Sequence, residues 1–317
     1  MVYPPHIAFV MDPIADINPA KDSTLALILA AQDKGCRISV MDQHDLWCIG
    51  ETAYGRWRNI FVRDDDTFEY SLNTPESGPL TAFDIVMMRS DPPVDKRFIH
   101  TTYTLEQGEA QGVRVVNRPA ALRDYNEKRF ACSFPALIPP TVIAADYNVL
   151  QDFRHQHERI VLKPLDAMGG QGVFVLAHDD PNFDVVWEMH TNKGAYPLMA
   201  QAFLPEIAEG DKRIIIHDGA PFDYALVRTP KGGSLRGNLA AGGSYKAQFL
   251  SDADRHIAET VGSVLKDKGI TFAGLDVIGD KLIEINITSP TGLRELVRLS
   301  DDDPARYIID AVAEMAD

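Results

Sequence analysis

Short apolar runs alternate with segments of helical spacing in the first third of the chain. Runs typical of buried strands lie at residues 6–10, 36–41, 84–88 and 113–116. Residues 23–35 have an N-cap candidate at their start, helical apolar spacing and a terminal glycine, and residues 95–111 also favour a helix. This β-α-β order predicts an α/β unit with helices on the faces of a parallel sheet, which we place at residues 1–120. The polar residues 50–80 are predicted to form a solvated loop or hairpin.

Two further units follow in the remaining two thirds. In residues 121–200 the pattern predicts a short helix near 126–134 and strands at 160–164 and 173–177. In residues 201–317 it predicts strands at 213–217 and 222–228, then a helix at 252–268 that carries an apolar stripe and is followed by Gly269. Asp303 and Pro304 predict the start of a last helix.

The apolar segment 272–290 contains three oxygen-bearing side chains, Asp276, Glu284 and Asn286. Acids among buried apolar residues are costly unless a positive group lies between them, and a divalent cation bound by oxygen is a natural partner. Glu284 and Asn286 are two residues apart on a predicted strand, so they share a face. The alternative is that these are edge-strand acids that face solvent.

Asp276 joins that face only if the turn has the right length. A two-residue turn would pair Val277 with Leu282 and send Asp276 and Glu284 to opposite faces. We expect instead a three-residue turn made of Gly279, Asp280 and Lys281, which sets Asp276 across from Glu284.

A glycine-rich loop joins two predicted strands between Lys163 and Val173. Because a strand follows it, the loop is neither a P-loop nor a dinucleotide fingerprint, both of which open a helix. Glycine amides at Gly169, Gly170 and Gly172 can approach phosphate oxygens closely, while Lys163 adds a positive charge. The loop is therefore interpreted as a phosphate-covering flap, with an ordinary hairpin turn as the alternative.

A second glycine-rich segment, residues 229–246, carries Lys231, Arg236 and Lys246. Its low apolar content and positive charge are typical of a mobile cover over an anionic site, and the alternative is a disordered surface loop. Lys128, Asp211, Arg213 and Arg228 are predicted near the same cleft. Together these groups predict a site for a metal-bound polyphosphate.

Composition narrows the function further. The formal net charge of −15 argues against nucleic acid or an anionic membrane as partner. No apolar run approaches the roughly 18–20 residues that a membrane span needs. The start has no signal-peptide pattern, and the 3 cysteines form no CxxC pair, so we expect a cytoplasmic enzyme without disulfides. The sequence also lacks HExxH and GxSxG, which removes support for a hydrolase.

A series of motifs lies in order along nearly the whole chain. The motifs are MDPI (11–14), MRSDPP (88–93), NEK (126–128), KPLDAMGGQGV (163–173), EGDKR (209–213), RGNLAAGG (236–243), GLDVIGD (274–280) and EINITSPTGLRE (284–295). Together they resemble the prokaryotic glutathione synthetase family of ATP-grasp carboxylate-amine ligases. The resemblance implies a two-subdomain ATP-grasp fold at residues 121–200 and 201–317, after the doubly wound domain. It also implies ATP-dependent joining of γ-glutamylcysteine and glycine through an acyl phosphate, in a homodimer or homotetramer.

The resemblance assigns roles to single residues. For ATP these are Lys128, Lys163, Gly169, Gly170, Gly172, Asp211 and the adenine hinge Gln201, Ala202, Phe203 and Leu204. Magnesium, or manganese in its place, would be held by Asp276, Glu284 and Asn286. The resemblance implies that Arg213, Arg228 and Arg236 are catalytic, and that Arg89, Ser289 and Arg294 bind the peptide substrate.

Other functions share many of these residues. Another ATP-grasp ligase, adding glutamate or D-alanine for example, would keep the metal and nucleotide residues and differ at the peptide-binding ones. A nucleotide-sensing module without catalysis is disfavoured by the complete carboxylate set and the lid arginine. A kinase is disfavoured because no base directed at a hydroxyl group is evident.

Overall fold

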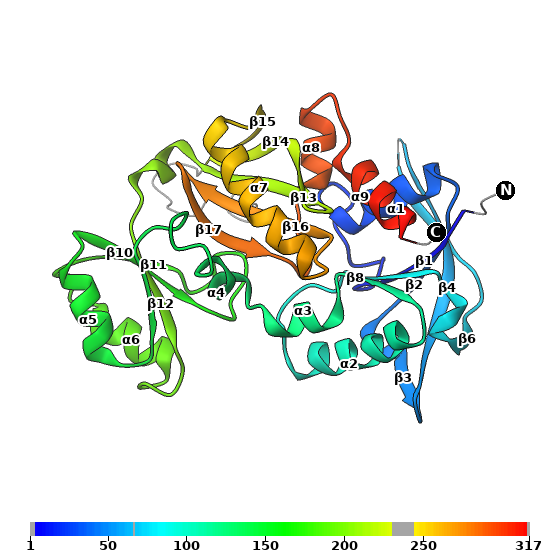
Figure 1. The fold of residues 1–317 in the computed structure, drawn as a ribbon, viewed down its shortest axis with the longest axis horizontal. Coiled ribbons are helices and arrows are strands. Elements are labelled where there is room, and N and C mark those ends of the chain that lie inside the picture. Colours follow the sequence, from blue (N-terminus) through cyan, green and yellow to red (C-terminus); the bar gives the residue numbers. More distant parts are fainter. Residues whose placement is uncertain (1–3, 66, 230–243, 316–317) are drawn as a thin grey trace.

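The computed structural model describes residues 4–65, 67–229 and 244–315, whose strands form sheets of eight, four and five strands. We call these the N-terminal, central and C-terminal sheets. Figure 1 shows the central sheet on the left, the C-terminal sheet in the middle and the N-terminal sheet on the right. The C-terminal sheet therefore lies between the other two.

The N-terminal sheet has a parallel centre, in the order β2-β1-β7-β8. Its strands are β1 (His6–Val10), β2 (Arg37–Met41), β7 (Ile85–Met88) and β8 (Arg114–Val116). Two helices make the crossovers, α1 (Ser23–Asp33) and α2 (Lys96–Ala110). The predicted parallel sheet is confirmed, and the cap of α1 is Asp22, whose side chain accepts from the amide of Leu25 at 2.7 Å.

Residues 50–80, predicted to form a solvated loop or hairpin, belong to an antiparallel extension of this sheet, and the antiparallel pairing of residues 60–64 with 68–72 confirms the hairpin. The strands of the extension are β3 (Leu46–Ile49), β4 (Thr52–Asp64), β5 (Phe68–Leu72) and β6 (Glu76–Pro79), and β4 pairs with the other three and with β2. Along β4, Ala53, Gly55 and Trp57 are buried while Arg56 and Arg58 are exposed. Because buried residues, two of them small, alternate with charged exposed residues, β4 contains no continuous apolar run from which a strand could be predicted.

The central sheet is antiparallel, in the order β11-β10-β12-β9. Its elements are β9 (Thr141–Ala144), β10 (Arg159–Pro164), β11 (Phe174–Ala177), β12 (Leu198–Ala202), α5 (Tyr147–His155) and α6 (Phe183–Thr191). The strand-loop-strand unit of β10 and β11 is present as predicted. Strand β12 runs across residue 200, where we drew the boundary between the second and third units.

The C-terminal sheet has the order β15-β14-β13-β16-β17 and is covered on one face by α7 (Asp252–Asp267). Its strands are β13 (Asp211–His217), β14 (Ala220–Thr229), β15 (Ser244–Phe249), β16 (Phe272–Ile278) and β17 (Lys281–Asn286). The remaining helices are α3 (Pro119–Asp124), α4 (Glu127–Ala131), α8 (Leu293–Leu299), α9 (Pro304–Glu314) and the 3-10 turns η1 (Gln43–Asp45), η2 (Leu80–Ala82) and η3 (Pro205–Glu209). As predicted, Asp303 caps α9 and Pro304 opens it.

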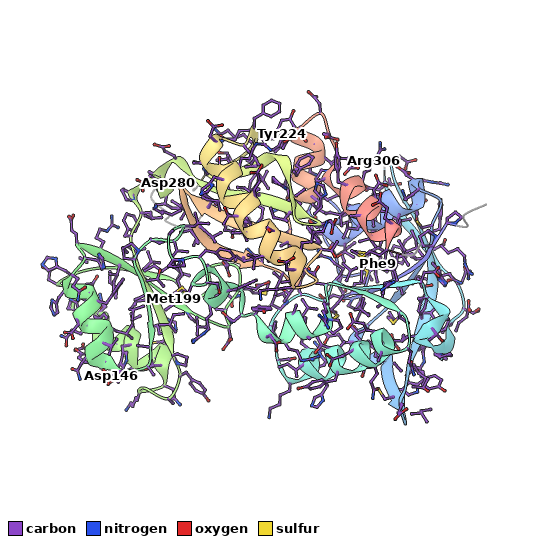
Figure 2. The ribbon with its side chains drawn as sticks, in the orientation of Figure 1. Phe9, Asp146, Met199, Tyr224, Asp280 and Arg306 are labelled. Carbon is purple, nitrogen blue, oxygen red and sulfur yellow. The ribbon has the colours of Figure 1, made fainter. Side chains whose placement is uncertain are left out.

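The N-terminal and C-terminal sheets share their hydrophobic cores, whereas the central sheet has a core of its own. One shared core joins Val10 to Leu275, and the other joins Phe9 to Ile215. The central core consists only of central residues, such as Leu150. Figure 2 shows Phe9 and Met199 far apart, in the N-terminal and central parts. Among the described residues, no helix combines the length and apolar character needed to cross a bilayer.

Candidate active site

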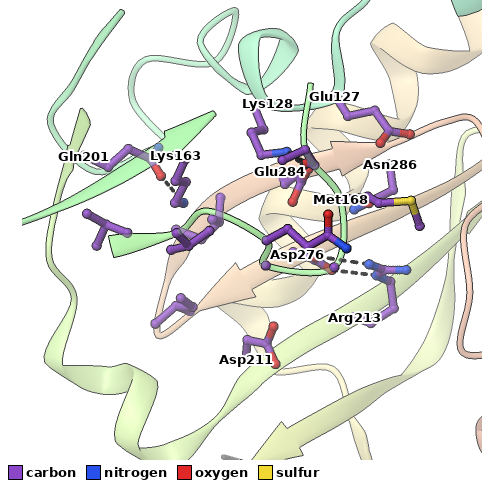
Figure 3. Close-up of a pocket in the computed structure, with 18 of the residues that line it drawn as sticks. Glu127, Lys128, Lys163, Met168, Gln201, Asp211, Arg213, Asp276, Glu284 and Asn286 are labelled. Atoms are coloured by element: carbon purple, nitrogen blue, oxygen red, sulfur yellow. Dashed lines mark hydrogen bonds and ion pairs between the residues drawn. The ribbon is translucent and has the colours of Figure 1, made fainter. Parts of the chain in front are cut away.

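A cavity of about 370 Å³ lies between the central and C-terminal sheets (Figure 3). Most of the predicted site residues line it, although they come from distant parts of the chain. They are Lys128, Lys163, Gly169, Gly170, Gln201, Ala202, Phe203, Leu204, Asp211, Arg213, Arg228, Asp276, Glu284, Asn286 and Ser289. One cavity thus gathers the predicted nucleotide, metal and catalytic groups.

The apolar end of the cavity lies at the predicted hinge after β12. Val161 pairs with Gln201 across β10 and β12 and with Val175 across β10 and β11, and these two valines line the cavity together with Ile283. The amides of Ala202 and Phe203 already donate to the carbonyls of Pro140 at 2.9 Å and Arg159 at 3.0 Å. Within the described hinge, the amide of Leu204 remains for a ligand. A flat apolar group with a polar edge fits this end.

Two lysines approach the cavity from α4 and β10. Nζ of Lys128 lies 3.2 Å from Oε1 of Glu284 and also donates to the carbonyl of Ala167 in the glycine loop. Nζ of Lys163 donates to Oε1 of Gln201. Burial lowers the pKa of Lys163 to about 8, because desolvation disfavours its charged form more than the nearby acids favour it.

The glycine loop has the backbone that its sequence predicts. Gly169, Gly170 and Gly172 all have positive φ, at 61°, 74° and 67°. Gly169 and Gly170 line the cavity, but Gly172 does not. A Cβ on Gly172 would lie 2.8 Å from the ring of His190 and 2.9 Å from that of Pro164, so this glycine is required by packing.

Asp276 faces Glu284, but not for the predicted reason. The turn is Gly279–Asp280, with Ile278 paired to Lys281 and Val277 to Leu282, so the three-residue turn is wrong. A β-bulge follows, in which β17 has an extra residue before Glu284. The bulge reverses the alternation and brings Asp276 opposite Glu284.

The acids of the C-terminal sheet are held by two arginines. Arg213 lies opposite Asp276 across β13 and β16, and its Nε and Nη2 contact both carboxylate oxygens at 2.5 and 3.0 Å. Arg228 contacts Asp276 at 3.0 Å and Asp211 at 3.0 Å. Burial alone would raise the pKa of Asp276, but the charges of Arg213 and Arg228 hold it well below its usual range. Burial raises the pKa of Asp211, despite its pairing with Arg228.

These oxygen ligands are chemically suited to a divalent cation. Asp276, Glu284 and Asn286 offer only oxygen donors apart from the amide nitrogen of Asn286, which donates to the carbonyl of Gly274 at 3.1 Å. Among the described residues, no group of three or more His, Cys, Asp or Glu side chains could hold a metal ion. The candidate set is therefore two carboxylates and an amide.

Besides Gly172, three predicted site residues do not line the cavity or fall outside the described ranges. Arg89 is buried and does not line the cavity; its Nη2 donates to the carbonyl of Pro290 at 3.0 Å, and burial lowers its pKa to about 10. Nη1 of Arg89 has no hydrogen-bond partner in the described part of the chain. Arg294 donates to Asp64 and to the carbonyl of Pro19, away from the cavity lining. Arg236 and most of the predicted lid, residues 230–243, are outside the described residues.

Glu127 and Asp91 line the cavity but were given no role from the sequence. Glu127 precedes Lys128 in the NEK motif, and that position was its only signal. Burial, followed by repulsion from Glu284, raises the pKa of Glu127. Asp91 follows β7, and its amide donates to Asp12 at 3.1 Å, which joins the loops after two parallel strands.

Comparisons with known proteins agree along the whole chain. The family model "Prokaryotic glutathione synthetase, N-terminal domain" matches residues 6–123, and "Prokaryotic glutathione synthetase, ATP-grasp domain" matches residues 127–301. The glutathione synthetase of Shewanella oneidensis is 47% identical over 96% of this chain and 97% of its own. That of Pseudomonas aeruginosa is also 47% identical, over 97% of each chain.

Solved structures resemble the fold at low identity. The D-cycloserine synthetase DcsG superimposes with a TM-score of 0.68 at 14% identity, over 98% of this chain and 100% of its own. The ATP-grasp ligase PsnB, complexed with a minimal precursor, has a TM-score of 0.65 at 16% identity, over 99% of both. The fold and the charged cavity define an ATP-grasp enzyme, an ATP-dependent ligase. Within that class, the chain belongs to the prokaryotic glutathione synthetase family.

Proposed function

We propose that this chain joins γ-glutamylcysteine to glycine, converting ATP to ADP and phosphate and releasing glutathione. The observation that carries the proposal is one cavity that collects lysines, arginines and carboxylates from two sheets beside an apolar hinge. The relatives that are 47% identical and are named glutathione synthetase support the choice of substrates.

The nucleotide would lie with its base at the hinge and its phosphates at the lysines. The amide of Leu204 is the donor left for adenine, with Val161 and Ile283 packing on the ring. Lys128 and Lys163 would exchange their present oxygen partners, Ala167 and Gln201, for phosphate oxygens. Amides of Gly169 and Gly170 complete the cover.

Asp276, Glu284 and Asn286 are the proposed ligands of Mg²⁺, with Mn²⁺ as a substitute. When bound, the ion neutralises charge on the phosphates. To bind it, the carboxylate of Asp276 must share its oxygens with the ion and the guanidiniums of Arg213 and Arg228. These arginines hold the carboxylate ionised, as a metal ligand must be.

The proposed reaction has two steps, phosphoryl transfer and then amide formation. A carboxylate oxygen of the cysteinyl group attacks the γ-phosphorus of ATP, and the bond to ADP breaks. The amine nitrogen of glycine then attacks the acyl carbon, phosphate leaves with the electron pair of the C–O bond, and the proton of the amine passes to solvent. Arg213 and Arg228 line the cavity. They would stabilise the negative charge on the phosphoryl group during its transfer, and then the charge on the oxygen of the tetrahedral intermediate that forms when glycine attacks the acyl carbon.

For the peptide, the proposed contact is Ser289, which lines the cavity and whose hydroxyl donates to the carbonyl of Arg89 at 3.2 Å. Arg89 would act through the 289–291 loop, since it holds the carbonyl of Pro290. Arg294, tied to Asp64, would steady the start of α8. We also propose that the protein is cytoplasmic and that it forms a homodimer or homotetramer. Light scattering of the purified protein would test the oligomeric state.

The decisive experiment incubates the protein with ATP, Mg²⁺ and γ-glutamylcysteine, with and without glycine, and measures ADP and glutathione. Glutathione that depends on glycine is the expected result. ATP consumption without a peptide product would overturn the choice of substrates. Replacing glycine with glutamate or D-alanine is the control for the other ATP-grasp ligases.

A further inference from the structure

The backbone just beyond β17 is held by a single carboxylate oxygen. Oε1 of Glu127 accepts from the amide of Ile287 at 2.8 Å, the amide of Thr288 at 3.0 Å and the hydroxyl of Thr288 at 2.9 Å. These donors follow directly on Asn286, the last residue of β17. Unpaired amides at this partly buried place would be costly, so the contact fixes where the strand ends.

Asn117 also holds the same segment. Its Nδ2 donates to the carbonyls of Ile287 and Phe272, both at 2.7 Å, and its Oδ1 accepts from the amide of Phe272 at 2.9 Å. The end of β17 is therefore tied both to α4 and to the segment before α3. Little freedom remains for Asn286.

Helix α4 also connects this strand to the phosphate side of the cavity. Lys128, the next residue, contacts Glu284 at 3.2 Å, and Nδ2 of Asn126 donates to the carbonyl of Leu165 at 3.1 Å, at the start of the glycine loop. Consecutive side chains of one short helix thus reach the strand of the metal ligands and the flap. Glu127 is the one that fixes the strand backbone.

We propose that Glu127 is a positioning residue that holds the end of β17 so that Asn286 and Glu284 present their oxygens to a divalent cation. The inference rests on the proposed function only in taking Asp276, Glu284 and Asn286 as metal ligands. Partners that orient metal ligands typically contribute about 10- to 100-fold to metal affinity.

The test measures Mn²⁺ binding to the protein–ADP complex from the EPR signal of free Mn²⁺. Glu127→Ala removes the acceptor, and we expect Mn²⁺ binding to weaken by about 10- to 100-fold. Glu127→Gln keeps an acceptor oxygen in the same place, so it should retain most of the affinity. In activity assays, Glu127→Ala should raise the KM for ATP while leaving the KM for γ-glutamylcysteine unchanged.

Glu295 offers a matched control. It is another buried glutamate, outside the cavity lining, and its carboxylate oxygens have no hydrogen-bond partner in the described ranges. Glu295→Ala should leave Mn²⁺ affinity unchanged. If Glu127→Ala does not fold, Thr288→Val removes only one of the donors and should weaken Mn²⁺ binding in the same direction, but less.

Wild-type affinity in Glu127→Ala would overturn the proposal. So would equal losses in Glu127→Ala and Glu127→Gln, because the glutamine keeps the hydrogen bonds, or an equal loss in Glu295→Ala. Since Mn²⁺ binding needs no peptide product, a protein that makes no glutathione can still pass this test. The two proposals therefore fail separately.

Discussion

The central and C-terminal sheets face each other across one cavity, yet only the C-terminal sheet shares its core with the rest of the chain. Leu275 packs in one cluster with Val10, while Leu150 belongs to a cluster confined to the central part. The C-terminal sheet also carries the paired arginines and acids, whereas the central sheet adds Lys163, the glycine loop and apolar side chains.

We infer from this difference that the two sheets have different roles in the reaction. A subdomain with its own core, such as the central one, can move as a rigid body, because few apolar contacts with the rest of the chain oppose the motion. Groups that stabilise a transition state need fixed geometry, which the shared core supplies. Groups that grip and release a nucleotide benefit from motion, and they lie on the central sheet.

A pair of core substitutions tests this comparison most directly. Leu150 on α5 and Leu265 on α7 are both fully buried, in the central and shared cores. Each change to alanine should cost about 2–5 kcal/mol. We expect Leu150→Ala to lower amide protection in hydrogen exchange only in residues 141–202, and Leu265→Ala to lower it in both other sheets. Equal, global losses from Leu150→Ala would contradict separate cores.

Loss of an arginine tests the catalytic role of the C-terminal sheet. Arg228→Ala removes a donor to the reacting groups and leaves Asp211 without its partner, so kcat should fall by about 10²–10³-fold. Arg255 on α7 pairs with Asp223 at the surface, and Arg255→Ala is the control. Steady-state kinetics measure both variants, and an unchanged kcat in Arg228→Ala would remove its assigned role.

The pH dependence of ATP binding tests the central sheet. Burial lowers the pKa of Lys163 to about 8, so its charge, which attracts phosphate, is present below that pH and is lost above it. The KM for ATP should therefore rise from about pH 8 upward, by at most about tenfold per pH unit. Lys163→Met should have a high KM for ATP at every pH, without the rise above about pH 8. A flat wild-type profile up to about pH 9.5 would show that Lys163 does not titrate there.

The smallest expected effect comes from Gly172→Ala. The positive φ of 67° alone should cost about 1–2 kcal/mol of the free energy of unfolding, and the close contacts with His190 and Pro164 add to this cost in the central sheet. Hydrogen exchange should place the loss in β10 and β11. Gly50→Ala, at a positive φ of 59° with nothing within 4 Å of the added Cβ, separates backbone strain from the clash.

Sequence reasoning reached most of the fold and of the cavity. Apolar runs predicted the parallel strands, because a strand covered on both faces has little else in it. The pattern failed for β4, whose inward positions include Ala53 and Gly55. Arg89 and Arg294 share their motifs with cavity residues, but their side chains turn to Pro290 and Asp64. Motif membership gives a residue's neighbourhood, not the direction of its side chain.

The sequence by itself determined many of the helices and strands, the family and the chemical types at the site, because local periodicity and short motifs are properties of neighbouring residues. Only the tertiary structure decided which groups meet. The bulge in β17 brought Asp276 opposite Glu284 despite a two-residue turn, since register depends on pairing along the whole ladder. Glu127 gained its role in the same way, because its partners at Ile287 and Thr288 lie 160 and 161 residues away in sequence.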